Sequence, residues 1–177
     1  MKYNVSHLLR ESVGTTQVFE LNVPPRKIEE GIESVAPTVG TVRLTRTNRG
    51  IVADVTVSTA IAQVCSRCIE DMTVPMRFRV VEEYYPTVDL RTGKPISIPD
   101  QGSGFLLTEA HELDLTEPIR QFSVLEMPMA PVCREDCRGL CLQCGENLNE
   151  GSCGCPRVPV DKRLATLSDW LKNNQLN

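Results

Sequence analysis

Eight cysteines are the residues of this 177-residue chain whose type and spacing point most directly to chemistry. Structural zinc is held by four ligands at the corners of a tetrahedron, and two cysteines on one tight turn can supply two of those corners. The cysteines fall into four such pairs, which are Cys65 and Cys68, Cys133 and Cys137, Cys141 and Cys144, and Cys153 and Cys155. Four pairs predict two four-cysteine sites for two Zn²⁺ ions, with no thiol left over.

Three other uses of the cysteines fit the sequence less well. Disulfide bonds belong to oxidising compartments, whereas the N-terminal residues 1–14 lack the apolar run of a signal peptide and predict a cytoplasmic protein. A redox Cys-x-x-Cys motif requires the N-terminus of a helix, but Cys65 and Cys68 lie between two predicted strands. The close triple spacing of ferredoxin clusters is absent.

Spacing does not decide which pairs share an ion, since four pairs can be divided between two sites in three ways. We favour one site that joins the first two pairs and a second, local site that joins the last two. The first site would then tie a β-hairpin to the segment that follows a helix. The main alternative joins the two Cys-x2-Cys turns, as zinc ribbons do, and leaves Cys133 and Cys137 with Cys153 and Cys155.

Alternating apolar and polar residues predict that the first two-thirds of the chain is β-rich. In the last predicted strand, Met76, Phe78 and Val80 fall on one face while Arg77 and Arg79 fall on the other. An antiparallel meander or partial barrel with one buried face would explain this pattern. The predicted strands cover Thr16–Val23, Thr38–Thr47, Ile51–Val64 and Met72–Tyr85.

Two helices are predicted to complete an α+β fold. The first follows Thr116, which we expect to be its N-cap, and ends before Pro128; the second covers Asp161–Asn173. The Pro- and Gly-rich residues 86–104 predict a long loop. We expect a single domain over residues 1–177, in which residues 1–128 form a β-rich body and residues 129–177 form the zinc-binding segment and the last helix.

Charge and composition limit the possible partners. A formal net charge of −4 is not that of a protein that coats naked nucleic acid. No run of 18 apolar residues occurs, so no membrane association is expected. A local basic face could still bind RNA phosphate, and the candidate side chains are Arg43, Arg46, Arg77 and Arg79. The alternative is a solvated sheet face on which Asp54, Glu70 and Asp71 balance these charges.

A protein partner is also compatible with the sequence. Met127 and Met129 follow the first predicted helix and would suit an adaptable contact, although packing in the core is the favoured explanation.

An enzyme is not expected. The chain has only two histidines, His7 and His111, and contains no phosphate-binding loop, nucleophile elbow or zinc-protease motif. A four-cysteine zinc site leaves no open position for catalysis. The acidic residues that could form a catalytic pair are better explained as solvated charges, and they are Glu82, Glu83, Glu112 and Asp114. We therefore predict no small-molecule substrate.

Three segments of the sequence resemble the YceD family of large-subunit ribosomal RNA accumulation proteins. They are VCSRCIEDM, the long segment from LDLTEPIRQF to GSCGC, and DKRLATL, and the resemblance covers roughly residues 4–171. It implies a role in accumulation of 23S ribosomal RNA and thus in assembly of the large ribosomal subunit. The resemblance implies that the last two cysteine pairs vary, while the first Cys-x2-Cys pair and the metal-binding residue types near Cys133 and Cys137 recur, which favours our first division of the cysteines.

The sequence thus predicts a non-catalytic factor that binds ribosomal RNA or a large-subunit ribosomal protein. The alternatives are a zinc-ribbon adaptor for a nucleic-acid-processing or ribosomal protein and, third, an RNA-processing enzyme.

Overall fold

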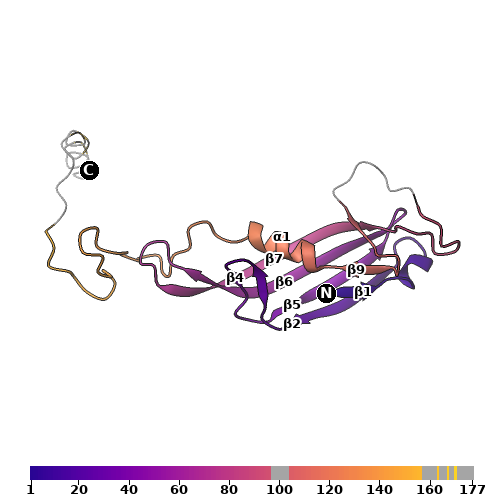
Figure 1. Cartoon of the computed structure of the whole chain (residues 1–177), viewed down its shortest axis with the longest axis horizontal. Helices are drawn as coiled ribbons and strands as arrows, with labels where there is room; N and C mark the ends of the chain where they lie inside the picture. The colour runs from indigo at the N-terminus through magenta and orange to yellow at the C-terminus, as the bar shows by residue number, and fades with distance from the viewer. Residues whose placement is uncertain (97–103, 157–162, 164–166, 168–169, 171–177) are drawn as a thin grey trace. The chain divides into compact units, whose positions relative to one another are not determined.

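A computed structural model describes residues 1–96 and 104–156, together with Arg163, Leu167 and Trp170 (Figure 1). The chain divides into two compact units. The first comprises residues 1–63 and 71–131, and the second comprises residues 64–70 and the segment from residue 132 onward. This division adds residues 64–70 to the predicted C-terminal segment, and the single domain over residues 1–177 stays a prediction. In the described part, every helix is too short or too polar to span a membrane.

The first unit is built on a five-stranded sheet with the strand order β2-β5-β6-β7-β8 (Figure 1). The antiparallel pairs β2–β5 and β5–β6 follow the predicted meander, but β8 joins β7 in parallel, with Tyr84 opposite Phe105. The prediction of a partial barrel is wrong. A barrel would require β8 to pair with β2, but β8 has only two residues and, among the described residues, pairs with β7 alone. The described strands therefore form an open, mixed sheet. The strands are β2 (Thr16–Val23), β5 (Thr38–Arg46), β6 (Ile51–Val64), β7 (Asp71–Tyr85) and β8 (Phe105–Leu106).

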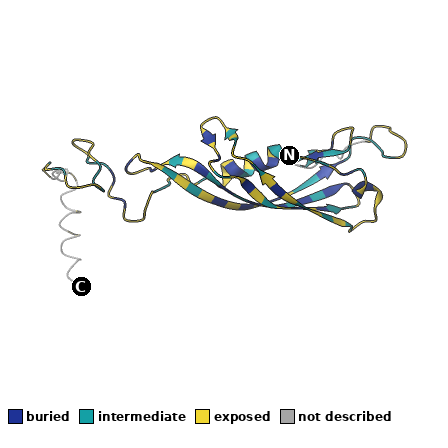
Figure 2. Ribbon diagram, turned by 90° about the horizontal axis from the view of Figure 1, so that it is seen from below, coloured by how far each residue is buried: buried dark blue, intermediate teal, exposed yellow. Residues whose placement is uncertain are grey.

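Burial alternates along the central strands as the sequence pattern predicts (Figure 2). In β7, Met76, Phe78 and Val80 are buried while Arg77 and Arg79 are exposed. Each buried side chain of this kind contributes roughly 1.5–3 kcal/mol when it is removed from water. This repeated burial fixes the register, because a slip by one residue would bring the arginines into the core.

Helix α1 (Thr116–Leu125) lies beside β7 (Figure 1). It also contacts β3, and its Ile119 side chain is in the core of the first unit. The predicted N-cap is wrong by one residue, since Leu115 occupies the N-cap position and makes no side-chain cap bond. The Asp114 carboxylate instead accepts hydrogen bonds from the Thr116 N–H at 2.9 Å and the Thr116 hydroxyl at 2.6 Å. This pair therefore fixes the start of the helix.

Two small ribbons and a 3-10 helix complete the unit, and the sequence did not predict their pairing. The strands β1 (Lys2–Asn4) and β9 (Glu112–Asp114) pair antiparallel. Between β2 and β5, β3 (Lys27–Glu29) and β4 (Ile32–Glu33) form a short hairpin. The 3-10 helix η1 (Leu8–Arg10) buries two leucines against the same core.

The described residues contain one α-helix where two were predicted for the chain. The second predicted helix, Asp161–Asn173, lies outside the described residues except for Arg163, Leu167 and Trp170.

Candidate metal centres

The six residues between β6 and β7 form a tight turn that carries the first cysteine pair. The Cys65 N–H donates to the Glu70 carbonyl at 2.9 Å, and the Ile69 N–H donates to the Cys65 carbonyl at 2.9 Å. Ile69 has a φ angle of 61°, in the left-handed region. This conformation is costly for a β-branched residue, so the local sequence alone does not favour the turn.

The segment Cys141–Glu146 repeats this turn with the same pattern of hydrogen bonds. The Cys141 N–H donates to the Glu146 carbonyl at 2.8 Å, and the Gly145 N–H donates to the Cys141 carbonyl at 2.9 Å. Gly145 has a φ angle of 76° and occupies the position equivalent to Ile69. Glycine adopts this conformation without steric cost. The two turns are therefore two copies of one cysteine-bearing backbone motif.

The first cysteine group combines the turn at Cys65 and Cys68 with Cys133 and Cys137. The four sulfur atoms lie within 4.8 Å of one another. The Cys65 and Cys137 sulfurs are 3.8 Å apart, and the Cys68 and Cys133 sulfurs are 3.7 Å apart. A tetrahedron with zinc–sulfur bonds of about 2.3 Å has edges of about 3.8 Å. These separations also exclude disulfide bonds, in which the sulfurs lie about 2.05 Å apart.

The second group combines the turn at Cys141 and Cys144 with Cys153 and Cys155. Its four sulfurs also lie within 4.8 Å of one another. None of these four cysteines is buried, whereas three of the four in the first group are. The second group is therefore the more accessible of the two.

The structure divides the eight cysteines in the way favoured from the sequence, and not as in a ribbon that joins the two Cys-x2-Cys turns. The donor set fits a soft divalent cation, since each group offers four sulfurs within 4.8 Å of one another. Either group could hold a metal ion.

Hydrogen bonds and neighbouring sulfurs shift the pKa values of the cysteines within each group in opposite directions. Backbone N–H groups, first that of Cys68 and then those of Arg67 and Cys133, lower the pKa of Cys65 to about 6. Removal from water and the nearby Cys137 sulfur raise the pKa of Cys133 to about 12. Four neighbouring sulfurs resist carrying four negative charges together, and a bound cation would supply the opposing charge.

The second group shows the same two opposing effects. The backbone N–H groups of Cys144 and Gln143 lower the pKa of Cys141 to about 6. The Cys144 sulfur and removal from water raise the pKa of Cys155 to about 12.

Arg67 and Gly139 connect the first turn to residues 135–140. The Arg67 guanidinium donates to the carbonyls of Glu135 at 3.2 Å and Cys137 at 3.0 Å. The Arg67 carbonyl accepts the Leu140 N–H at 3.1 Å. Gly139 permits this approach, because a Cβ atom there would lie 2.9 Å from the Arg67 carbonyl oxygen.

Asn147 and Asn149 were not identified from the sequence, but they support the first cysteine group. The Asn149 side-chain amide donates to the Cys137 sulfur at 3.4 Å, and its carbonyl accepts the Arg138 N–H at 2.8 Å. The Asn147 amide donates to the Glu70 carboxylate at 2.9 Å. Both residues precede Cys153 in sequence, so the loop that closes the second group also supports the first.

The predicted basic face carries both basic and acidic side chains where β5, β6 and β7 lie side by side. Arg43 on β5 lies opposite Asp54 on β6. Arg79 on β7 forms a bidentate ion pair with the same carboxylate at 2.7 and 2.8 Å. This hydrogen bond from Arg79 lowers the pKa of Asp54 and keeps the carboxylate charged. Arg77 is exposed on the same strand face as Arg79.

Arg46 does not share the face of Arg43, because the two residues are three apart on a strand whose side chains alternate. Its guanidinium donates to the backbone carbonyls of Leu9 at 3.2 Å and Gly50 at 2.9 Å. The four predicted arginines therefore do not form one patch.

Two of the candidate catalytic carboxylates, Glu83 and Asp114, and one of the two histidines, His7, have partners of their own. Glu83 accepts hydrogen bonds from the Arg49 guanidinium and the Tyr85 hydroxyl. Asp114 accepts from Thr116 and from the N-terminal ammonium, and these bonds outweigh its burial and lower its pKa. His7 lies 3.6 Å from the Glu11 carboxylate, and both are exposed.

The two candidate contact methionines also differ. The Met127 sulfur accepts a hydrogen bond from the Gln63 amide at 2.8 Å, and the side chain packs against the core. Met129 is fully exposed.

Comparison with known proteins supports the resemblance noted in the sequence. The family model described as "Large ribosomal RNA subunit accumulation protein YceD" matches residues 53–171. An Arabidopsis thaliana protein named as a chloroplastic YCED homolog 1 is 38% identical over 67 residues, which is 38% of this chain and 21% of that protein. A Zea mays protein of the same name is 47% identical over 45 residues, which is 25% of this chain and 15% of that protein.

A bacterial relative aligns over a greater length. An uncharacterized protein of Mycobacterium tuberculosis is 28% identical over 179 residues, which is 97% of this chain and 81% of that protein. The matched segment spans about a fifth of the Arabidopsis protein. No solved structure matches the chain.

Proposed function

Because this chain belongs to the YceD family, we propose that it is a non-catalytic, cytoplasmic factor that promotes accumulation of 23S ribosomal RNA and assembly of the large ribosomal subunit. The observation that carries this proposal is the family match over residues 53–171, which begins in β6 and includes all eight cysteines. Its partner would be ribosomal RNA or a large-subunit ribosomal protein.

We further propose that both cysteine groups are structural zinc sites. Cys65, Cys68, Cys133 and Cys137 would hold one ion, and Cys141, Cys144, Cys153 and Cys155 would hold the other. Zinc in such a closed site contributes folding free energy, and its four cysteine ligands leave no coordination position open. Its role here would be to hold two separate parts of the sequence in one unit. The chain's own Arg67 and Asn149 orient the turns around the first group.

Contact with RNA through the exposed sheet face is a further part of this proposal. Arg43 and Arg77 are exposed there, and Arg79 extends the row although it is paired with Asp54. Arginine contacts to phosphate give affinity without sequence preference. Arg46 does not belong to this face, since strand alternation places its side chain on the side of β5 opposite to Arg43.

Depletion of the protein in its host tests the proposed function. We expect 23S ribosomal RNA to fall relative to 16S ribosomal RNA, and sucrose gradients to show a deficit of large subunits. A plasmid copy of the wild-type chain should restore both. Unchanged 23S levels after complete depletion would contradict the proposal.

An adaptor function is favoured by a different observation. Leu142, at the tip of the second turn, is 90% exposed, and it lines a hollow of about 650 Å³ with Leu140 and Leu148. An exposed apolar tip of this kind suits a protein partner. Capture of a ribosomal or nucleic-acid-processing protein that survives ribonuclease treatment and is lost in Leu142→Ser would favour this alternative.

A further inference from the structure

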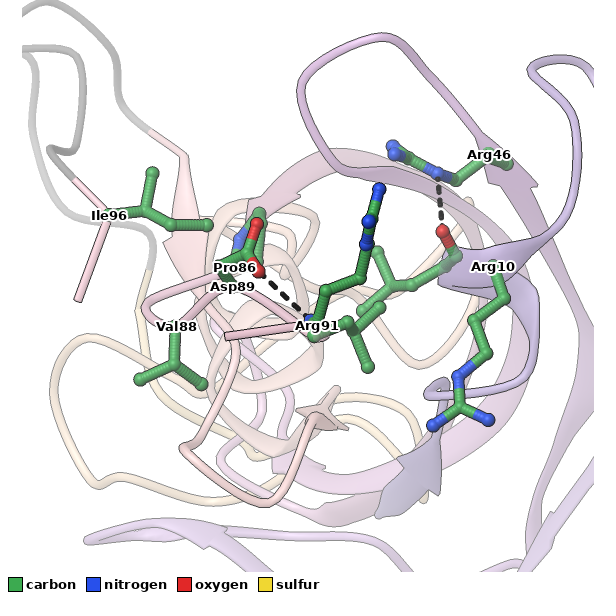
Figure 3. A pocket seen from close by; sticks show the side chains of 9 residues that line it. Arg10, Arg46, Pro86, Val88, Asp89, Arg91 and Ile96 are labelled. Carbon is green, nitrogen blue, oxygen red and sulfur yellow. Dashed lines mark hydrogen bonds between the residues drawn. The ribbon is translucent and has the colours of Figure 1, made fainter. Parts of the chain in front are cut away.

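A second hollow lies within the first unit, between η1 and the loop that follows β7 (Figure 3). It has a volume of about 460 Å³, within the range of ligand sites. Three arginines line it, Arg10, Arg46 and Arg91, together with a single acidic residue, Asp89. The remaining wall is apolar and includes Val88. Three cations and one anion give this small hollow an excess of positive charge in an otherwise acidic protein.

Arg46 is held in place while part of its guanidinium stays available. Its Nε donates to the Leu9 carbonyl at 3.2 Å, and its Nη1 donates to the carbonyls of Gly50 and Thr47. A guanidinium has five N–H bonds, so these contacts leave the two N–H bonds of Nη2 without a partner among the described residues. A donor whose orientation is already fixed loses little entropy when it binds a ligand.

The other charges around the hollow do not neutralise one another by direct contact. The Asp89 carboxylate is engaged in its own turn, where it accepts the N–H of Arg91 at 2.9 Å, the N–H of Thr92 at 2.8 Å and the Thr92 hydroxyl at 3.0 Å. The guanidinium groups of Arg10 and Arg91 have no hydrogen-bond or ion-pair partner in the described part of the chain. Figure 3 shows the head groups of Arg46 and Arg91 turned to the same side, with that of Arg10 apart from them.

We propose that this hollow binds a phosphate of an RNA backbone, held by Arg46 and Arg91 with Arg10 as a flanking contact. The planar fork of arginine matches phosphate oxygens in pairs, and its charge does not depend on pH in the physiological range. The apolar wall would contact the sugar or base of the adjoining nucleotide. This inference rests on the proposed function, because it supplies the contact through which the chain would reach ribosomal RNA.

Binding of a labelled single-stranded RNA oligonucleotide to the full chain, measured across a salt series, tests the site. Each lost phosphate contact lowers the slope of log K against log salt by about 0.7 for single strands. We expect Arg91→Ala and Arg10→Ala each to weaken binding several-fold and to reduce the slope. Lys27→Ala is the matched control, since this exposed lysine on β3 carries the same charge but does not line the hollow. It should change affinity less than twofold.

Several results would overturn the site. Binding unchanged in Arg91→Ala, or weakened equally in all three variants, would show that the hollow makes no specific contact. Binding of an acidic peptide in place of RNA would assign the hollow to a protein partner instead. Binding of inorganic phosphate at millimolar concentration, without any binding of RNA, would assign the hollow to a free anion. Thermal unfolding of each variant checks that the fold is retained.

The same variants separate this inference from the proposed function. If depletion lowers 23S ribosomal RNA but Arg91→Ala binds RNA normally, the function stands and the site is wrong. If Arg91→Ala loses RNA binding but depletion leaves 23S ribosomal RNA unchanged, the site stands and the proposed function is wrong.

Discussion

The two cysteine turns share one backbone but differ in what surrounds them. In the first, Cys65 and Cys68 are buried, and Arg67 is bonded to two carbonyls of the segment that brings Cys133 and Cys137. In the second, Cys144 is exposed, and Leu142 at the equivalent tip projects into solvent.

This difference separates two tasks that one motif can perform. The first turn joins residues more than 60 positions apart in the sequence, so its contacts decide whether residues 64–70 are held to the segment that carries Cys133 and Cys137. The second turn closes a local loop and leaves an apolar tip exposed. We therefore expect the first site to dominate stability and the second site to be the more labile and the better placed for contact with a partner.

The largest expected effect follows from removing one ligand at equivalent positions of the two turns. The free energy of binding a structural zinc ion, about 10–16 kcal/mol in zinc-finger peptides, counts as folding free energy. Cys65→Ser should therefore release the segment around Cys133 and Cys137 from the first turn and expose it to limited proteolysis, while the local second site is retained. Cys141→Ser should leave the segment around Cys133 and Cys137 protected. Equal proteolysis of both variants would contradict the division of tasks.

The two sites should differ in the rate at which a chelator removes their zinc. Because the second group is more accessible, a chelator with a colorimetric readout should remove one equivalent of zinc quickly and a second more slowly. In Cys141→Ser the fast phase should disappear. A single phase for both ions in the wild-type chain would show that exposure of the sulfurs does not control release.

A smaller effect is expected for Asn149, which lies in the loop of the second cysteine group but donates a hydrogen bond to a cysteine of the first. Loss of an outer partner of a metal ligand typically costs about 10–100-fold in metal affinity. Asn149→Ala should weaken the first site by about tenfold, because Cys137 loses its amide donor, and should leave the affinity of the second site unchanged. Glu150→Ala, at an exposed neighbouring position, is the control. Weakening of the second site alone would refute this assignment.

The smallest expected effects have opposite signs at Ile69 and Gly145. A left-handed conformation costs a side chain roughly 1–2 kcal/mol, and the extra chain freedom of glycine costs about 0.5–1 kcal/mol. Ile69 is 66% exposed, so Ile69→Gly loses little burial and should stabilise the protein slightly. Gly145→Ala should destabilise it by roughly 1 kcal/mol, because the cost of the left-handed conformation is partly offset by the smaller chain freedom of alanine in the unfolded state. Denaturant unfolding of the zinc-loaded chain measures both, and shifts of equal sign would contradict the strain at Ile69.

The sequence predicted the parts of this structure that depend on local pattern. The four long strands follow from alternation, and β2 and β6 have the predicted bounds. Counting the cysteines in pairs predicts two four-cysteine groups, and the family resemblance favours the division of the pairs that the structure has. These signals are readable because each depends on residues that are close in sequence or identical in type.

The remainder depends on contacts that no local pattern encodes. The pairing of β1 with β9 joins residues 110 positions apart through strands of only three residues. The role of Asn149 depends on where Cys137 lies in space, and the left-handed conformation of Ile69 contradicts its local preference. Arg46 was grouped with Arg43 by proximity in sequence, although strand alternation places the two on opposite faces.

Native mass spectrometry of the purified chain tests the central claim most directly. The wild-type protein should carry two zinc ions. A variant with Cys65 and Cys68 replaced by serine should carry one, as should a variant with Cys141 and Cys144 replaced, and the combined variant should carry none. A wild-type chain with one ion or none, or with the mass of a disulfide-bonded form, would contradict the two four-cysteine sites.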